Sequence, residues 1–389
     1  MRRYLLAIAL ILVVFMAGCI GGSGSTNSPE KSEQQSEHTQ SPVEGNQQED
    51  WSYFEFETSG GDIGYSLNEG RLSKDGVDVY VLLIDEPAKF AKVNPVWEAT
   101  MSDVWANSVV FQVDDGVHYF SIEDGEVEHR SMRVVGDLFD FMVLNEKSYL
   151  GLENGVLRLY NSEAKGYREK KGVISYALTM KDGEIIVVTA SLDGIEVTRF
   201  SNEGEALQEA YTFDCPIFYL HHALVDDMPS GFYMATSCGL YYVDEDFSVH
   251  DSGLGDESWD IISNDNDESG AIVVYSEDTG GIMGVFYDPE SGGFAHSALL
   301  EVDTKPDGAS VSGLYLALLY GDTLYLYKLE EEGEYRLHGT IKLPEPAKDV
   351  KVATVENGVL EIGVAWDGGF TYMVGPLEGF EGTQELIWG

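Results

Sequence analysis

The sequence predicts an all-β fold, a β-propeller built from four-stranded blades. A short phrase, a turn that ends in glycine followed by an alternating apolar strand, recurs seven times from Gly116 to Gly369. Its glycines lie 39 to 48 residues apart, which is the length of chain that one blade of four strands requires. Nowhere does the chain show the apolar period of an amphipathic helix.

The strands themselves are expected in pairs joined by tight turns. The junctions carry Asp-Gly, Asn-Gly, Gly-Asp or Gly-Gly, whose backbones accept the positive φ angles that short hairpins need. The expected pairs are 108–113 with 117–122, 139–144 with 156–160, 185–189 with 195–200, 232–236 with 240–243, 271–275 with 282–287, 314–320 with 323–329, and 359–366 with 370–374.

The number of blades depends on how residues 51 to 99 are counted. They suggest an eighth unit with weaker spacing, and division of residues 51–389 by eight gives about 42 residues a blade. We therefore expect eight blades, with seven as the alternative. We also expect the Trp51 region to pair with residues 386–388, because closing the ring removes exposed sheet edges. A closed ring of this kind is expected to be a monomer.

The chain begins with an export signal. Arg2 and Arg3 precede an apolar run of 13 residues from Leu5 to Ala17, which suits a cleaved signal peptide better than a membrane span. Small residues then lead directly to Cys19, and this stretch resembles the lipobox of prokaryotic, particularly archaeal, lipoproteins. That resemblance implies a signal peptide over 1–18 and a lipid on Cys19. The alternative is an uncleaved N-terminal anchor.

Residues 19–50 are expected to be a flexible tether. They consist largely of Gly, Ser, Gln, Glu, Asn, Thr and Pro, and cannot bury enough apolar surface to offset the entropy of ordering. Residues 51–389 then form the propeller domain. Either form of anchor places this domain on the extracytoplasmic face of the cell membrane.

The charge of the chain excludes one class of partner. There are 68 acidic and 23 basic residues, and the formal net charge is −45. A negative field of this strength repels nucleic-acid phosphates and favours cations or basic partners. Residues 200–304 contain 22 acidic residues and no lysine or arginine, a pattern typical of a solubilising or salt-adapted surface.

The repeated phrase also resembles a known propeller family. Residues 115–125, Asp-Gly-Val-His-Tyr-Phe-Ser-Ile-Glu-Asp-Gly, are similar to the repeat of the pyrroloquinoline-quinone-like family. The likeness covers most of residues 100–389 in a degenerate form, without the tryptophan that usually closes each repeat. It implies either a non-enzymatic lipoprotein scaffold or a quinoprotein dehydrogenase.

Two cysteines remain after Cys19, namely Cys215 and Cys238. They lie near the start of one expected strand and the end of its antiparallel neighbour, where their side chains can meet. An even pair in an exported domain favours a disulfide, with two buried free thiols as the alternative.

One acidic turn is a candidate calcium site. Asp265, Asp267 and Ser269, followed by Gly270, resemble the start of a loop that supplies alternate oxygen ligands to Ca²⁺. Ser276 stands where such a loop needs a bidentate glutamate, so the alternative is a solvated turn between two strands.

The remaining motifs give no support to catalysis. His221 and His222 are adjacent and should point to opposite faces of a strand, one packed and one exposed. The chain has neither a Gly-x-Ser-x-Gly elbow nor a His-Glu-x-x-His helix. We therefore expect a binding or scaffold protein for a protein, peptide or glycan partner. The alternative is an extracytoplasmic enzyme, a quinoprotein-like dehydrogenase or a carbohydrate-active propeller.

Overall fold

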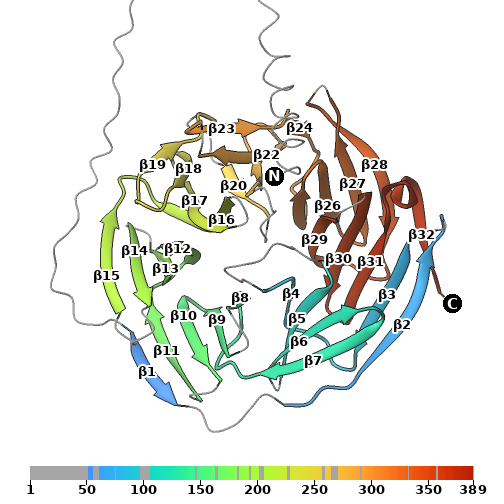
Figure 1. Ribbon diagram of the computed structural model, residues 1–389, viewed down its shortest axis with the longest axis horizontal. Helices are drawn as coiled ribbons and strands as arrows, with labels where there is room; N and C mark the ends of the chain where they lie inside the picture. Colours follow the sequence, from blue (N-terminus) through green and yellow to red (C-terminus); the bar gives the residue numbers. More distant parts are fainter. Residues whose placement is uncertain are drawn as a thin grey trace, which may run out of the picture.

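A computed structural model describes most of the chain from Trp51 to Trp388. The described part excludes residues 56–60, 75, 97–105, 115, 145–146, 163–164, 182–183, 192–193, 201–205, 226–227, 256–258, 264–269, 290, 332 and 356–357. The described strands form sheets arranged in a ring around one axis (Figure 1). The expected all-β propeller is thereby confirmed.

Five of the sheets are separate blades, each built mainly from strands consecutive in the chain. In chain order they comprise β4 (Phe90–Val93), β5 (Ser108–Val113), β6 (Gly116–Glu123) and β7 (Glu126–Met132); β8 (Asp140–Val143), β9 (Ser148–Glu153), β10 (Val156–Asn161) and β11 (Gly166–Lys171), extended by β1 (Ser52–Glu55); β12 (Ser175–Lys181), β13 (Glu184–Ser191), β14 (Gly194–Phe200) and β15 (Ala206–Thr212); β16 (Ile217–Val225), β17 (Met228–Thr236), β18 (Gly239–Val243) and β19 (Val249–Asp251); and β20 (Trp259–Ile261), β21 (Ile272–Ser276), β22 (Gly281–Asp288) and β23 (Gly293–His296), with β24 (Leu300–Glu301) beside β22.

The sixth sheet has ten strands and contains both early and late parts of the chain. Its order is β25 (Gly308–Ser312), β26 (Tyr315–Tyr320), β27 (Thr323–Leu329), β28 (Tyr335–Lys342), β32 (Gly382–Trp388), β2 (Tyr65–Leu72), β3 (Asp78–Ile84), β31 (Gly369–Pro376), β30 (Val359–Trp366) and β29 (Ala347–Val355). A short 3-10 helix, η2 (Leu377–Phe380), leads from β31 to β32.

The expectation of eight blades, or seven, is wrong for the described strands. They form five blades and one ten-stranded sheet. One cause is that β32 pairs in parallel with β28 and antiparallel with β2, and so joins strands that the spacing assigned to different blades. The other is that residues 51–99 do not form a unit of their own, because β1, the pair β2–β3, and β4 belong to three different sheets.

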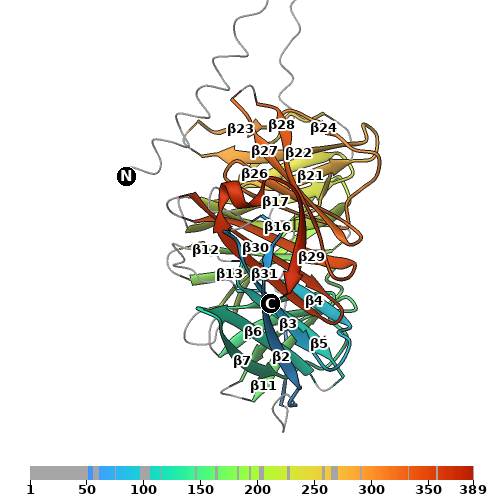
Figure 2. The same cartoon turned by 90° about the vertical axis from the view of Figure 1, so that its right-hand side faces the viewer.

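Ring closure also differs from the expected arrangement. β32 pairs with β2, where Gly70 is opposite Trp388, and β3 pairs with β31 over six residue pairs from Asp78 to Leu83. The Trp51 region instead lies against another sheet, since β1 pairs with β11. Closure therefore uses the second and third described strands, and β32 ends at the outer rim of the ring (Figures 1 and 2).

The core lies between neighbouring sheets. Side chains that alternate along a strand point to opposite faces of its sheet, and in a ring both faces pack on a neighbour. β5 illustrates this, because all six of its residues are buried. Figure 1 shows these sheets next to one another around the ring. Within the described residues, we find no helix with the length and apolar character needed to cross a bilayer.

Candidate functional site

The innermost strands bring polar side chains toward the axis of the ring. β4, β8, β12, β16 and β29 are each the edge strand of their sheet. These edges face the centre of the ring in Figure 1. Five of their residues form what we call the axial cluster, namely Lys92, Asp140, Tyr176, His222 and Lys351.

Three members of the axial cluster are buried polar or charged residues. Lys92 is 7% exposed, Lys351 is 1% exposed and His222 is 8% exposed. Lysine is almost never buried to this degree unless its charge is compensated, because desolvation of an ammonium group is costly. The inner strands therefore carry two buried ammonium groups, and the carboxylates of Asp140 and Asp349 lie on the same set of strands.

An ion pair joins two of the inner strands. Lys92 Nζ on β4 lies 2.6 Å from Asp140 Oδ1 at the start of β8. The same oxygen accepts a hydrogen bond from the Phe141 amide at 2.8 Å. Because the Lys92 side chain is 9% exposed and that of Asp140 is 24% exposed, water screens this pair less than it would screen a surface pair.

The two adjacent histidines of β16 do not separate into one packed and one exposed residue. Both are buried, with His221 2% exposed, and their ring centroids lie 5.0 Å apart in a stacked arrangement. His221 and His222 lie in regular register opposite Tyr233 and Phe232, and the ladder shifts only after His222. Both histidines are buried because in the ring both faces of an inner strand are covered by neighbouring elements. His221 Nδ1 also lies 2.7 Å from the His222 carbonyl oxygen.

The electrostatics of His222 reflect its position. Burial holds the pKa of His222 well below its usual value, and His221, Lys92 and Lys351 lower that pKa further. The charges of β4 and β29 thus act on the imidazole of β16, and His222 is neutral at pH 7.

Tyr176 supplies a phenol to the cluster from β12. Burial raises the pKa of its hydroxyl well above the usual value, and the neighbouring Asp140 carboxylate raises that pKa further. The hydroxyl is buried and faces Asp140 without making a hydrogen bond of normal geometry. Tyr176 therefore remains a neutral donor beside a carboxylate.

Asp349 fixes the junction between β29 and β4. Its Oδ2 accepts a hydrogen bond from the Val93 amide at 2.7 Å, and its Oδ1 accepts one from the Val350 amide at 3.0 Å. Lys351 lies two residues further along β29 and therefore has its side chain on the same face of the strand as Asp349.

The axial cluster could not be recognised in the sequence. Its members lie on five strands spread from Lys92 to Lys351, and no motif spacing links them. A local signal does exist, because both lysines interrupt short apolar strands, in Phe90–Val93 and in residues 350–353. A lysine in such a strand either faces solvent or is buried with its charge compensated. Only the arrangement of the strands in the ring shows which of these two cases applies.

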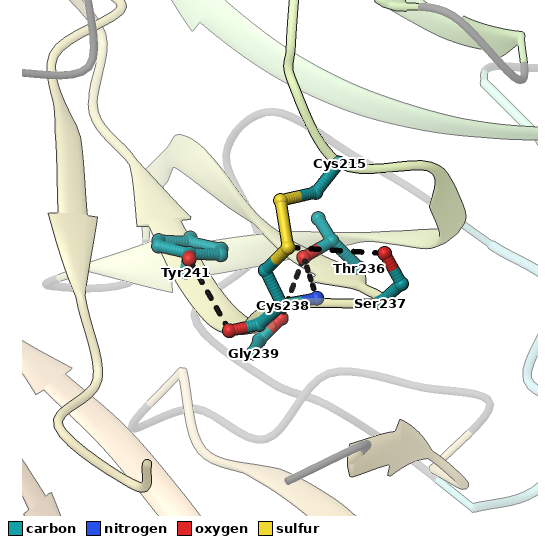
Figure 3. The surroundings of a disulfide bond; sticks show 6 residues. All are labelled: Cys215, Thr236, Ser237, Cys238, Gly239 and Tyr241. Atoms are coloured by element: carbon teal, nitrogen blue, oxygen red, sulfur yellow. Dashed lines mark hydrogen bonds between the residues drawn. A yellow bond between two sulfur atoms is a disulfide. The ribbon is translucent and has the colours of Figure 1, made fainter. Parts of the chain in front are cut away.

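The expected disulfide is confirmed. Cys215 and Cys238 are joined, with their Cα atoms 5.9 Å apart (Figure 3). The bond links the segment before β16 to the turn between β17 and β18. Around it, Thr236 Oγ1 accepts a hydrogen bond from the Cys238 amide at 3.1 Å, and the Tyr241 hydroxyl donates to the Cys238 carbonyl at 3.4 Å.

Two other predicted sites lie outside the described residues. They are the lipidation site at Cys19 and the calcium ligands Asp265, Asp267 and Ser269. Among the residues that the structure describes, no group of three or more histidine, cysteine, aspartate or glutamate side chains is placed to hold a metal ion.

Comparisons with known proteins identify no family. No family model matches the chain, and no curated protein matches its sequence. Similar solved structures include the β-propeller domain of Cps50 (Swd1) from Myceliophteria thermophila, at 12% identity and a TM-score of 0.49, covering 71% of this chain and 97% of that one.

Two further structures show the same level of similarity. A putative 6-phosphogluconolactonase from Bacteroides uniformis is 15% identical with a TM-score of 0.48, and the match covers 74% of this chain and 98% of that one. A catalytically inactive virginiamycin B lyase from Staphylococcus aureus with quinupristin is 11% identical with a TM-score of 0.46, covering 80% and 99%. Such likeness concerns the fold, and no role passes from these proteins to this chain.

Proposed function

We propose that this chain is an exported lipoprotein whose propeller binds a protein, peptide or glycan partner. The supporting observation is the exposure of two phenylalanines at the start of inner strands. Phe139, directly before β8, is 70% exposed, and Phe218, the second residue of β16, is 47% exposed. Exposed aromatic rings offer large contact areas at a small cost in conformational entropy, and they are enriched where partners bind.

The surroundings of Phe139 strengthen this proposal. Asp140 of the axial cluster follows it directly, so an apolar ring and a charged pair occupy neighbouring positions at one end of β8. Binding sites commonly combine an apolar contact with a few polar groups that fix orientation.

Export and anchoring rest on different observations. The apolar run and small residues that precede Cys19 support cleavage and lipidation, and the disulfide supports an oxidising compartment. The repeated Asp-Gly phrase supports a relationship to the scaffold lipoproteins of the pyrroloquinoline-quinone-like repeat family. The propeller would then be held near the membrane by residues 19–50.

Binding is tested with the purified full chain in detergent on glycan and peptide arrays, followed by affinity measurement on the strongest component. Phe139→Ala and Phe218→Ala should each weaken that affinity about tenfold. Leu337→Ala removes a side chain that is 55% exposed on β28, away from the inner strands, and should change affinity less than about twofold. An affinity unchanged by both phenylalanine variants, or no bound component on either array, contradicts the proposal.

Anchoring is tested by detergent phase partitioning of the chain expressed in a host that processes lipoproteins. The wild-type chain should enter the detergent phase, and Cys19→Ser should not become lipidated. Intact mass should show a lipid adduct on Cys19 after loss of residues 1–18. A mature chain that retains residues 1–18 without lipid would instead support the uncleaved anchor.

A further inference from the structure

We propose that one part of the outer rim docks on an anionic membrane surface. This part, which we call the rim patch, consists of Tyr53 and Phe54 on β1, Lys165 directly before β11, and Arg168 and Lys171 on β11. β1 is the outermost strand of its sheet, at the opposite edge from β8 (Figure 1). The proposal rests on the membrane anchor of the proposed function and adds the orientation in which the anchored propeller is held.

Basic residues gather in this part of the chain. Five of the 23 lysines and arginines lie within residues 158–171, where only Glu163 and Glu169 are acidic, whereas residues 200–304 contain no lysine or arginine. A strongly acidic molecule thus has a locally basic segment, and that segment forms outer strands of one blade.

The positive charges of the rim patch remain accessible. Glu169 is 9% exposed and accepts a hydrogen bond from Arg158 Nε at 3.2 Å. Lys171 Nζ lies 3.7 Å from Glu169 Oε1, but 78% of the Lys171 side chain is exposed, so water weakens this pair. Lys165 is also exposed. Two ammonium groups at the two ends of β11 can therefore face a charged surface.

Exposed aromatic rings accompany these charges. Tyr53 is 53% exposed and directly opposite Arg168, and Phe54 is 41% exposed and stacks on Tyr167 with ring centroids 5.2 Å apart. Aromatic and basic side chains together are typical of protein surfaces that lie in the membrane interface. Glu55 is the one acidic residue of β1 and opposes the attraction. The rim patch otherwise combines apolar contact with positive charge.

A hollow opens beside the rim patch. Its volume is about 360 Å³, and it is lined by Ser52, Glu169, Lys170, Lys171 and Glu196. Lys170 pairs with Glu196 of β14, across the boundary between two blades. The Lys171 ammonium group and the Ser52 hydroxyl can donate hydrogen bonds to the phosphate of a lipid headgroup that enters the hollow.

The charge of the whole molecule determines which side can approach a membrane. The net charge of −45 opposes contact with an anionic bilayer, but charges more than about 8 Å away are largely screened at physiological ionic strength. A locally basic rim is therefore attracted where an acidic rim is repelled. β1 also follows directly after the expected tether, residues 19–50, which brings this rim near the anchor.

The first experiment measures how fast each lysine is acylated in the lipidated full chain. The chain is placed in nanodiscs of phosphatidylcholine, with or without about 30% phosphatidylglycerol. Lys165 and Lys171 should react about fivefold more slowly in the anionic discs, and about 0.5 M sodium chloride should remove the difference. Lys342 and Lys348, with side chains 57% and 49% exposed, are internal controls and should react equally in both discs. Equal rates for Lys165 and Lys171 in the two lipids overturn the proposal.

The second experiment removes the charge and follows amide hydrogen exchange in β1. In the wild-type chain, exchange at the β1 amides should be about threefold slower in anionic than in zwitterionic discs. The double variant Lys165→Gln with Lys171→Gln should lose this difference. The matched control, Lys342→Gln with Lys348→Gln, removes the same charge elsewhere and should keep it. Loss of the difference in both double variants would show that only the net charge matters, and would overturn the proposal.

Failure of the anchor is distinguishable from failure of the rim patch. A chain that does not remain in zwitterionic discs lacks the proposed anchor, and the rim patch is then tested by sedimentation of this chain with vesicles of the same anionic composition. The wild-type chain should bind about tenfold more tightly than Lys165→Gln with Lys171→Gln. Both chains have the same N-terminal residues, so equal binding overturns the proposal.

Discussion

β3 and β1 come from the same early part of the chain, and each completes a sheet made largely of later strands. β3 lies between β2 and β31, so its backbone forms ladders on both sides. β1 pairs only with β11, over four residues, at the edge of its sheet. Their side chains differ in the same sense: Val79, Val81 and Leu82 of β3 are at most 2% exposed, whereas all four residues of β1 are exposed.

This difference shows that two early strands have different roles: β3 closes the ring, whereas β1 only attaches the first described residues to it. β3 joins the early chain to the last strands, and without it β31 would present an open edge. β1 adds an outer strand to a blade that is already complete. What holds the start of the domain is Trp51, which is 6% exposed and donates from Nε1 to Thr198 Oγ1 at 3.3 Å. We therefore expect stability to depend far more on β3 than on β1.

The largest effect is expected for Leu82→Ala in β3. Leu82 is fully buried between sheets, and truncating such a leucine removes transfer free energy and leaves a cavity. The free energy of unfolding should fall by about 3 kcal/mol, measured by urea denaturation. The control is Leu83→Ala on the same strand, where the side chain is 40% exposed and the loss should stay under about 1 kcal/mol. Equal losses would show that burial in β3 does not govern closure.

The contrast between local and distant strand pairing also explains which parts of this fold could be predicted from the sequence. The turn between β9 and β10 follows from local chemistry, because Asn154 and Gly155 adopt φ angles of 49° and 78°, as their residue types predict. The strand expected opposite 156–160 was wrong, since β10 pairs with Ser148–Glu153 and not with 139–144. The partners of β1 and β3 depend on pairing across more than 100 residues in sequence, which no local pattern specifies. The axial cluster is hidden for the same reason, because β4 and β29, which carry Lys92 and Lys351, lie side by side only when the ring closes.

A smaller effect on stability is expected from removing the disulfide. The disulfide cross-links a single blade covalently, whereas β3 closes the whole ring through hydrogen bonds. Cys215 and Cys238 are 23 residues apart, and removing a cross-link of that span frees the unfolded chain. The double variant Cys215→Ser with Cys238→Ser should lose roughly 2 kcal/mol of unfolding free energy. Reductant should have the same effect on the wild-type chain and none on the double variant. Wild-type stability that is insensitive to reductant would contradict this.

The next prediction concerns Glu153, which lies on β9 in the blade that β1 extends. It is 2% exposed and accepts hydrogen bonds from Tyr160 and Arg158, yet burial raises its pKa above the usual carboxyl value. A raised pKa means that the folded state favours the protonated form. Its contribution to stability is therefore fully present below the pKa of the unfolded chain and is lost as the pH rises through the folded pKa.

Glu153→Gln keeps a neutral side chain of similar shape, so it should remove this pH dependence. Urea denaturation from pH 4 to pH 8 should show the wild-type chain losing stability relative to the variant as the pH increases. Comparing the two chains at each pH cancels the effect of the other acidic groups. A stability difference that is constant with pH, or that grows in favour of the wild-type chain, would contradict the assignment.

The smallest effect is expected for Phe54→Ala in β1. Phe54 is 41% exposed and stacks on Tyr167 of β11, with ring centroids 5.2 Å apart. Losing this pair should cost about 0.5–1 kcal/mol. Hydrogen exchange should become faster at the amides of β11 that face β1 and stay unchanged in β3, because the two strands belong to different sheets. A loss as large as that of Leu82→Ala would mean that β1 is coupled to closure of the ring, and the distinction between the two strands would fail.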